Sequence, residues 1–495
     1  MQKNSIQAQD TGILRNLSLS QKLISFFSFF LIALSILNSV NNWSLLGMTT
    51  SSFTVLMIFA SSIILWLFVA VDWPSLLCLL LLGLLPEIGF KSVFQQSFGS
   101  STFVFLTLTF TLSYCLQETP ALKRLTARVL NSRWAGESAW RFVIAYLTVL
   151  LFMACFMSPT ILFMIIFPIY EAICEQFAWQ KGDKSAGILL FASYTVIAIG
   201  TAMTPINHVF AITAMGIYEE AYGEAISYGQ YMSLAIPIGL ILFLIILLSI
   251  RYIWRLDLSD LTAGNVDILD NLPAASKRET WIVGVFIMVI ALWLLPELLA
   301  PVFPSLAAFF KSAGNTFPPL IGLIFLALLS IEGEELVKLP EALKNGVYWP
   351  SLLLVGSALA LGGALTNPEI GLISWLKENL SASLAGLAPW LLILVFIAWA
   401  GIQTNLSSNL VTVTVVSHMA ITILQSQNEV SINTAALISL VGFMASLAMM
   451  TPPAMPYVGI SIGSKWLSSR QAFSYGLWIL LWAIVLGVVA VSLVA

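Results

Sequence analysis

The chain has 495 residues, of which 59% are hydrophobic and only 9% are charged, and its mean hydropathy is +0.95. These values exclude an ordinary soluble globular protein, in which about 25% of residues are charged. They predict an all-α polytopic membrane protein, because a lipid-facing chain must pair its own backbone groups. The formal net charge of −3 comes without a block of basic residues, so we expect no nucleic-acid partner.

Eleven apolar segments approach the about 20 residues that cross a membrane. They lie at 23–40, 53–71, 74–90, 101–119, 187–216, 228–250, 281–300, 317–331, 346–366, 433–462 and 472–494. The first of them follows the polar stretch Met1–Gln21 and has no cleavage site after it, so we interpret it as a span and not as a signal peptide. An interfacial helix is the alternative, since serines at 25, 28 and 35 weaken this segment.

Two further apolar segments, 143–169 and 387–424, are each split by a short polar motif. The motifs are Ser158-Pro159-Thr160 and Ser408-Asn409, and each is followed later in the chain by a Thr-Pro pair, at Thr204 and at Thr451. A helix break leaves amides and carbonyls unpaired, so it persists in a membrane only where it faces protein, water or ligand. We therefore predict two re-entrant hairpins, 143–169 and 387–424, and two broken helices, 187–216 and 433–462.

The basic residues support a definite orientation. With a cytoplasmic N-terminus, only Lys91, Lys311 and Lys377 of the 21 Lys and Arg residues fall outside, as the positive-inside rule requires. We expect a multi-pass protein of the inner cell membrane with an extracytoplasmic C-terminus and hairpins that enter from opposite faces. The expected parts are an N-terminal tail with scaffold helices (1–100), a first repeat (101–255), a cytoplasmic loop (256–280), scaffold helices (281–345) and a second, inverted repeat (346–495).

Paired breaks in inverted repeats are how many secondary transporters form a mid-membrane site. Helix N-termini there favour an anion, and unwound carbonyls favour a small cation. Neither hairpin break carries Lys or Arg, so co-bound cations would have to neutralise a divalent anion. The substrate-binding candidates are the hydroxyl and amide side chains Ser158, Thr160, Asn207, Ser408, Asn409 and Thr451. The alternative is that such hydroxyls only bond back to helix carbonyls.

The chain has two histidines, and both lie near the predicted site. His208 directly follows the first Thr-Pro motif and could carry a proton during transport, since histidine titrates near physiological pH. His418 is expected to be a packed, neutral residue. No Gly-rich phosphate loop or His-Glu-x-x-His motif is present, so the sequence predicts neither a nucleotide-driven pump nor an enzyme, and no cofactor.

Several motifs resemble those of the divalent anion:sodium symporter family, the sodium-coupled carriers of dicarboxylates, citrate and sulfate. Phe98–Phe103 is similar to the opening of that family's first repeat, and Thr404–Leu410 is similar to its Thr-Glu-Phe-Thr-Ser-Asn-Thr hairpin tip. Pro168 matches a family proline that follows the first tip serine. The resemblance extends from about Phe98 to the C-terminus.

The resemblance implies an elevator-type carrier, usually a homodimer in the lipid bilayer, in which a transport domain with both hairpins slides against a scaffold. It also implies that the tips bind carboxylate and sodium together. The sodium ligands that it implies are Ser158 and Met203 in the first half and Thr404, Ser408, Asn409 and Ala454 in the second.

Four positions depart from the family pattern. Pro159 replaces the first tip asparagine, Leu410 the second tip threonine, Ala454 a later asparagine and His418 a proline. We therefore expect a secondary transporter of a small divalent anion, sodium-coupled through at least the second site. A sodium-independent exchanger or proton-coupled carrier of the same fold is the main alternative, and an anion channel is a further one.

Overall fold

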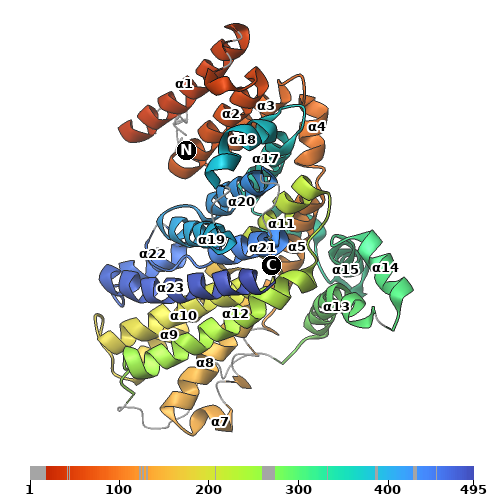
Figure 1. Cartoon of the computed structure of the whole chain (residues 1–495). Coiled ribbons are helices and arrows are strands. Elements are labelled where there is room, and N and C mark those ends of the chain that lie inside the picture. The colour runs from red at the N-terminus through yellow and green to blue at the C-terminus, as the bar shows by residue number, and fades with distance from the viewer. Residues whose placement is uncertain are drawn as a thin grey trace, which may run out of the picture.

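The computed structural model describes residues 18–494 apart from 42, 44, 122–123, 125–127, 130–131, 207, 259–273, 301, 332, 385–387, 427–431 and 453. The described chain is built almost entirely of helices (Figure 1). Its described strands are β1 (Ser330–Ile331) and β2 (Glu334–Glu335), which pair antiparallel.

The first helices of the chain gather at one end of the molecule (Figure 1). They are α1 (Leu19–Asn41), the short η2 turn (Leu45–Gly47), α2 (Thr50–Phe68), α3 (Trp73–Gly83) and α4 (Gly89–Gln96). Helix α5 (Ser101–Gln117) leads from there toward the middle of the molecule, where it contacts α11 and α15. Side-chain caps set two of the helix starts: the Thr49 hydroxyl accepts from the Ser52 amide, and the Ser100 hydroxyl accepts from the Phe103 amide. Such caps satisfy amides that have no partner within the helix.

The next helices carry the first predicted break. They are α7 (Arg133–Gly136), α8 (Ala139–Ala154), α9 (Pro159–Gln176), α10 (Lys184–Met203), α11 (Val209–Tyr222) and α12 (Tyr228–Leu248), which continues into the π-helical turn η3 (Ser249–Ile253). In α10 every residue of the most apolar window is buried. This helix is therefore the centre of the packed core, and it packs against α8, α9 and α12.

A separate group of three helices follows, α13 (Lys277–Leu299), α14 (Pro304–Ala313) and α15 (Phe317–Leu328), and lies together at one side of the molecule (Figure 1). The chain then forms α16 (Leu339–Gly346), α17 (Trp349–Thr366) and the amphipathic α18 (Leu372–Leu384). Helix α17 packs against α3, α4 and α5 as well as α11 and α20, so it joins the N-terminal helices to the C-terminal ones.

The last helices carry the second predicted break. They are α19 (Pro389–Leu406), α20 (Asn409–Gln425), α21 (Thr434–Ala445), α22 (Pro456–Gly463) and α23 (Ser469–Leu493). Helix α21 contacts α10, α11 and α12, and α23 contacts α12. The elements that carry the two breaks thus pack directly on one another although they are far apart in the sequence.

Seven described helices are long and apolar enough to cross a membrane, or eight if the bent pair α4 and α5 counts as one span. Only unbroken helices of 18 or more residues are among these seven, so the expected count of about eleven spans stays a prediction. The segment expected to span at 74–90 is a helix only over the 11 residues of α3, because the chain turns at 84–88 before α4 begins. The segment at 317–331 is helical over 12 residues, in α15.

The outer surface of these helices is apolar. Phe26 on α1, Leu244 on α12 and Leu481 on α23 are each more than half exposed. Large exposed apolar faces are rare on soluble proteins, and in this chain they fit contact with lipid.

Candidate functional site

The first break consists of two interruptions, one between α8 and α9 and one between α10 and α11. Helix α8 ends at Ala154, and α9 begins with Ser158 as its N-cap and Pro159 in its first turn. Proline is tolerated there because the first-turn amide has no helical partner. Helix α10 ends at Met203, Thr204 is extended, and α11 begins only after His208. Asn207, a predicted substrate ligand, lies outside the described residues.

The second break has the same form. Helix α19 ends at Leu406, and the extended residues Ser407 and Ser408 separate it from α20. Helix α21 ends at Ala445, and the next described helix, α22, begins at Pro456. The Ser408 hydroxyl caps α20 by accepting from the Val411 amide, whereas Ser158 makes no side-chain cap.

Equivalent hydrogen bonds hold both breaks. The Thr204 hydroxyl donates to the carbonyl of Cys155 at 2.7 Å, and the Thr451 hydroxyl donates to the carbonyl of Asn405. Cys155 and Asn405 are each the third residue before the tip serine of their half. Each threonine thus ties the unwound end of one helix to the end of the helix before the tip.

Buried tyrosines repeat the pattern on the other side of each threonine. Tyr231 donates to the carbonyl of Ala202 at 2.7 Å, and Tyr194 donates to the carbonyl of Met449 at 3.0 Å. Both acceptors lie two residues before the threonine of the Thr-Pro motif. The two halves of the chain therefore stabilise their unwound segments in the same way.

Asn405 is a residue of the site that sequence reasoning missed. Its side-chain oxygen accepts from the amides of Met449 and Met450 at 2.8 and 2.9 Å, and its nitrogen donates to the carbonyls of Gly401 and Leu447 at 2.8 and 2.9 Å. In an unbroken helix α21, backbone carbonyls would have accepted the hydrogen bonds of the Met449 and Met450 amides, and the Asn405 oxygen takes their place. A buried asparagine in an apolar helix was the available signal, since such groups are rarely left unpaired.

Three predicted sodium ligands converge at the second break. One terminal atom of the Asn409 amide lies 2.9 Å from the Ala454 carbonyl oxygen and 3.2 Å from both the carbonyl oxygen and Oγ1 of Thr404. The Thr404 hydroxyl donates its proton to the Ala445 carbonyl at 2.6 Å, so its lone pairs face this point. Because all three neighbours are oxygens that accept hydrogen bonds, the atom at this point is the amide nitrogen, which donates to them. Ser408 lies next to Asn409 at the start of α20.

The predicted residues of the first half are more open. Ser158 and Thr160 are half-buried in the first turn of α9, and Met203 is the last residue of α10. The bond from Thr204 to Cys155 joins the end of α10 to the end of α8, three residues before Ser158. In the second half, Thr451 is half-buried and Asn409 is buried.

His208 joins the first break to the second. Its ring atom Nε2 is hydrogen-bonded to the hydroxyl of Ser446, the first residue after α21, and the imidazole is buried. Its Nδ1 atom is buried without a hydrogen-bond partner among the described residues. Ser446, which the sequence did not single out, thus completes a contact between the two unwound segments.

His418 occupies a different position. Its Nδ1 atom bonds to the carbonyl of Thr414 at 2.7 Å within the same helix, and its ring meets Phe59 edge-on. The ring also lies against Gly362, where an added Cβ would be 2.4 Å from Nε2. These contacts are those of a packed core residue.

Sequence relatives carry transporter names. A profile described as citrate transporter matches residues 54–442. A sodium-dependent dicarboxylate transporter of Staphylococcus saprophyticus is 28% identical over 433 residues, which cover 84% of this chain and 80% of that protein. A protein of the same name from Staphylococcus aureus is 26% identical, and the aligned region covers 82% of this chain and 78% of that protein.

A solved structure shares the fold. The YdaH transporter of Alcanivorax borkumensis superimposes with a TM-score of 0.54 at 14% identity, covering 81% of this chain and 87% of that one. The profile match spans most of the sequence, which identifies this chain as a multi-pass membrane transporter and not an enzyme, and it confirms the resemblance to the divalent anion:sodium symporters. The chain belongs to the citrate transporter family.

Proposed function

We propose that the protein is a secondary active transporter of a small divalent anion, a dicarboxylate or citrate-like molecule, driven by sodium. The observation that carries this proposal is the group of oxygens at the second break, where Thr404, Asn409 and Ala454 converge. Rotation of the Asn409 amide would turn its oxygen inward and supply a further ligand for a cation. Sodium favours such oxygens, and the names of the relatives agree with it.

The substrate would bind between the two tips. Helices α9 and α20 begin at Ser158 and Ser408, so both offer first-turn amides and a partial positive charge to a carboxylate. The Thr160 hydroxyl and the amide of Asn207 would complete this lining. Thr451, whose hydroxyl donates to the Asn405 carbonyl, would border it. The two breaks carry no Lys or Arg, so bound sodium would supply the positive charge that a dianion needs.

The packing supports an elevator movement. Helices α10, α11 and α12 contact α21, and α19 and α20 pack on it as well. We propose that α8–α12 and α19–α23 move as one body with the two tips, while α1–α5 and α13–α18 form the scaffold, and that two copies assemble through their scaffolds. In this scheme the tips form re-entrant hairpins in an inverted repeat.

A second candidate is a sodium-independent exchanger or a proton-coupled carrier. Pro159 and Leu410 lack the polar groups that the family places at the tips. The contact between His208 and Ser446 puts a titratable ring between the two unwound segments. A proton on His208 could then take the place of one cation.

Uptake by purified protein in liposomes separates the two candidates. We expect succinate, citrate or sulfate to enter empty liposomes when external sodium is present, and uptake to fall to background when choline replaces sodium. Asn409→Ala should abolish uptake, whereas Asn379→Ala, at an exposed position on α18, should not. Uptake that is unchanged in choline would refute sodium coupling. Uptake only into substrate-loaded liposomes would favour exchange, and a shift of its pH profile in His208→Gln would favour proton coupling.

A further inference from the structure

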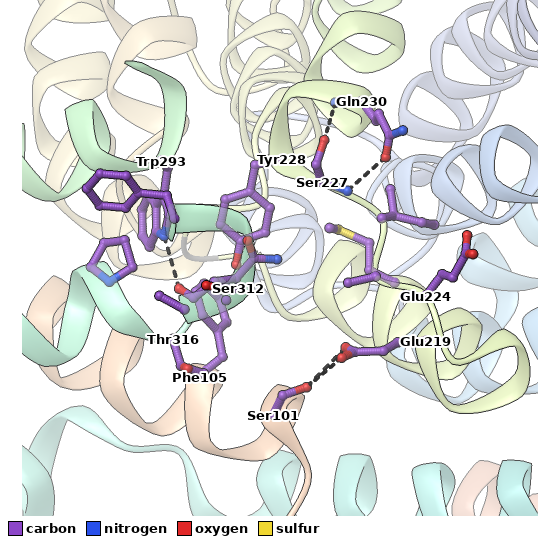
Figure 2. Close-up of a pocket in the computed structure, with 18 of the residues that line it drawn as sticks. Ser101, Phe105, Glu219, Glu224, Ser227, Tyr228, Gln230, Trp293, Ser312 and Thr316 are labelled. Atoms are coloured by element: carbon purple, nitrogen blue, oxygen red, sulfur yellow. Dashed lines mark hydrogen bonds between the residues drawn. The ribbon is translucent and has the colours of Figure 1, made fainter. Parts of the chain in front are cut away.

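None of the residues that line a cavity of about 1010 Å³ belongs to either break. Its walls come from α5, α13, α14 and α15 on one side and from the end of α11 and the start of α12 on the other. Figure 2 shows polar and aromatic side chains from these elements around the cavity. Its volume is at the upper end of the range of about 300–1,000 Å³ in which small-molecule sites fall.

The floor of the cavity is aromatic. Phe105, Tyr228 and Trp293 are buried, and their ring centroids are 5.2 to 5.8 Å apart. The indole nitrogen of Trp293 already donates to the carbonyl of Asn315 at 3.1 Å. What this indole offers a ligand is therefore its π surface, which attracts cations.

The rim of the cavity is acidic. The Ser101 hydroxyl donates its one proton to the carboxylate of Glu219, whose two oxygens lie 3.0 and 3.1 Å from Oγ, and this contact joins α11 to α5 across the cavity wall (Figure 2). Glu224 lines the same cavity and is exposed. Among the described residues that line it, there is no Lys or Arg. Two carboxylates would repel a dianion, so this cavity does not suit the transported substrate.

We infer that this cavity is a second binding site, specific for an organic cation with an aromatic or alkyl body. The carboxylates of Glu219 and Glu224 neutralise its ammonium group, and the rings of Phe105, Tyr228 and Trp293 pack on its body. A ligand in this position contacts both groups of helices that the proposed function assigns to the moving and static parts. Binding therefore holds these parts together and inhibits transport. This inhibition rests on the proposed function, whereas the binding of the cation to the cavity is independent of it.

Thermal unfolding of the detergent-purified protein tests the site without transport. Benzyltrimethylammonium should raise the unfolding temperature in a saturable manner, because a ligand that binds only the folded state stabilises it, and neutral benzyl alcohol should not. Replacing both carboxylates, Glu219→Gln with Glu224→Gln, should raise the half-saturating concentration at least about tenfold, as should Trp293→Leu. Glu369→Gln, which changes an exposed acid outside the cavity, should leave it unchanged.

Three results would overturn the inference. They are no saturable stabilisation of the wild-type protein, equal stabilisation by benzyl alcohol, and undiminished affinity in the variants. Should the double variant fail to fold, Glu224→Gln alone decides, since this side chain is exposed. In the liposome assay, the cation should lower the maximal uptake rate without changing the KM for the anion, and a raised KM would place it in the substrate site instead. Loss of this inhibition with retained binding would contradict the proposed movement but not the site.

Discussion

Asn405 fixes the geometry of the unwound segment at the second break. It replaces backbone hydrogen bonds that α21 loses at Ala445, and the Thr451 hydroxyl in turn donates to its carbonyl. The chain from Leu447 to Thr451 is thereby held against the end of α19. Ala454, whose carbonyl faces Asn409, is the third residue after Thr451. We interpret Asn405 as a positioning residue for the proposed cation site.

Replacing Asn405 by Asp should destabilise the protein. The carboxylate still accepts from Met449 and Met450, but it cannot donate to the carbonyls of Gly401 and Leu447, which it then faces as a buried charge. Loss of satisfied buried hydrogen bonds costs about 1–3 kcal/mol for each unpaired group. Thermal unfolding of the purified variant measures the loss. Asn379→Asp, on an exposed face of α18, is the matched control, and equal unfolding temperatures for the two variants would contradict the role of Asn405.

The tip motif pointed to Thr404 and Asn409, and the structure places the Asn409 amide beside both Thr404 and Ala454. The roles of these residues as ligands stay predictions. The bonds of Asn405 with Leu447, Met449 and Met450, and the bond of His208 with Ser446, could not be predicted, because each joins residues more than 40 positions apart. A single sequence contains no signal for such distant pairs.

At the scale of helices, α8 and α10 depend on one glycine for their close approach. A Cβ added at Gly200 would lie 2.4 Å from the carbonyl oxygen of Leu151 and 2.7 Å from the Ala154 side chain. The end of α8, which carries Cys155 toward Thr204, is therefore seated on α10 at this point.

Gly200→Val should push α8 away from α10. Overpacking of a dense core costs about 1–3 kcal/mol, and here it would also disturb the bond between Thr204 and Cys155. Unfolding temperature and uptake should both fall. Gly284→Val, on α13, is the control for the change in helix propensity, because a Cβ added at Gly284 has no neighbour within 4 Å. A variant at Gly200 as stable as the one at Gly284 would show that the two helices do not pack as described.

The helix breaks were predictable because their causes are local. Pro159, Pro205 and Pro452 each remove a backbone donor beside polar residues, so the sequence alone locates the interruptions. The turn between α3 and α4 was missed because Trp73–Phe90 is nearly continuous in its apolar character, and hydropathy does not detect a bend. The turn contains Pro86 and ends at Gly89, whose φ is +72°, so a local signal was present.

At the scale of the molecule, the orientation in the membrane follows only from the basic residues. The predicted topology places Lys377 on the outer side of the membrane and Lys338 on the cytoplasmic side, and both side chains are exposed. We expect Lys377→Cys to react with a membrane-impermeant maleimide added to intact cells, and Lys338→Cys to react only after the cells are opened. The unmodified chain gives the background of its four native cysteines. Reaction of the two positions from the same side would contradict the predicted topology.

Sodium coupling is the central claim, and the movement of sodium itself tests it most directly. The measurement is ²²Na⁺ influx into liposomes that contain the purified protein, with and without external succinate or citrate. Influx should be accelerated by the anion, and Asn409→Ala should remove this acceleration while Asn379→Ala retains it. Anion uptake that proceeds with no anion-dependent ²²Na⁺ influx would contradict the account.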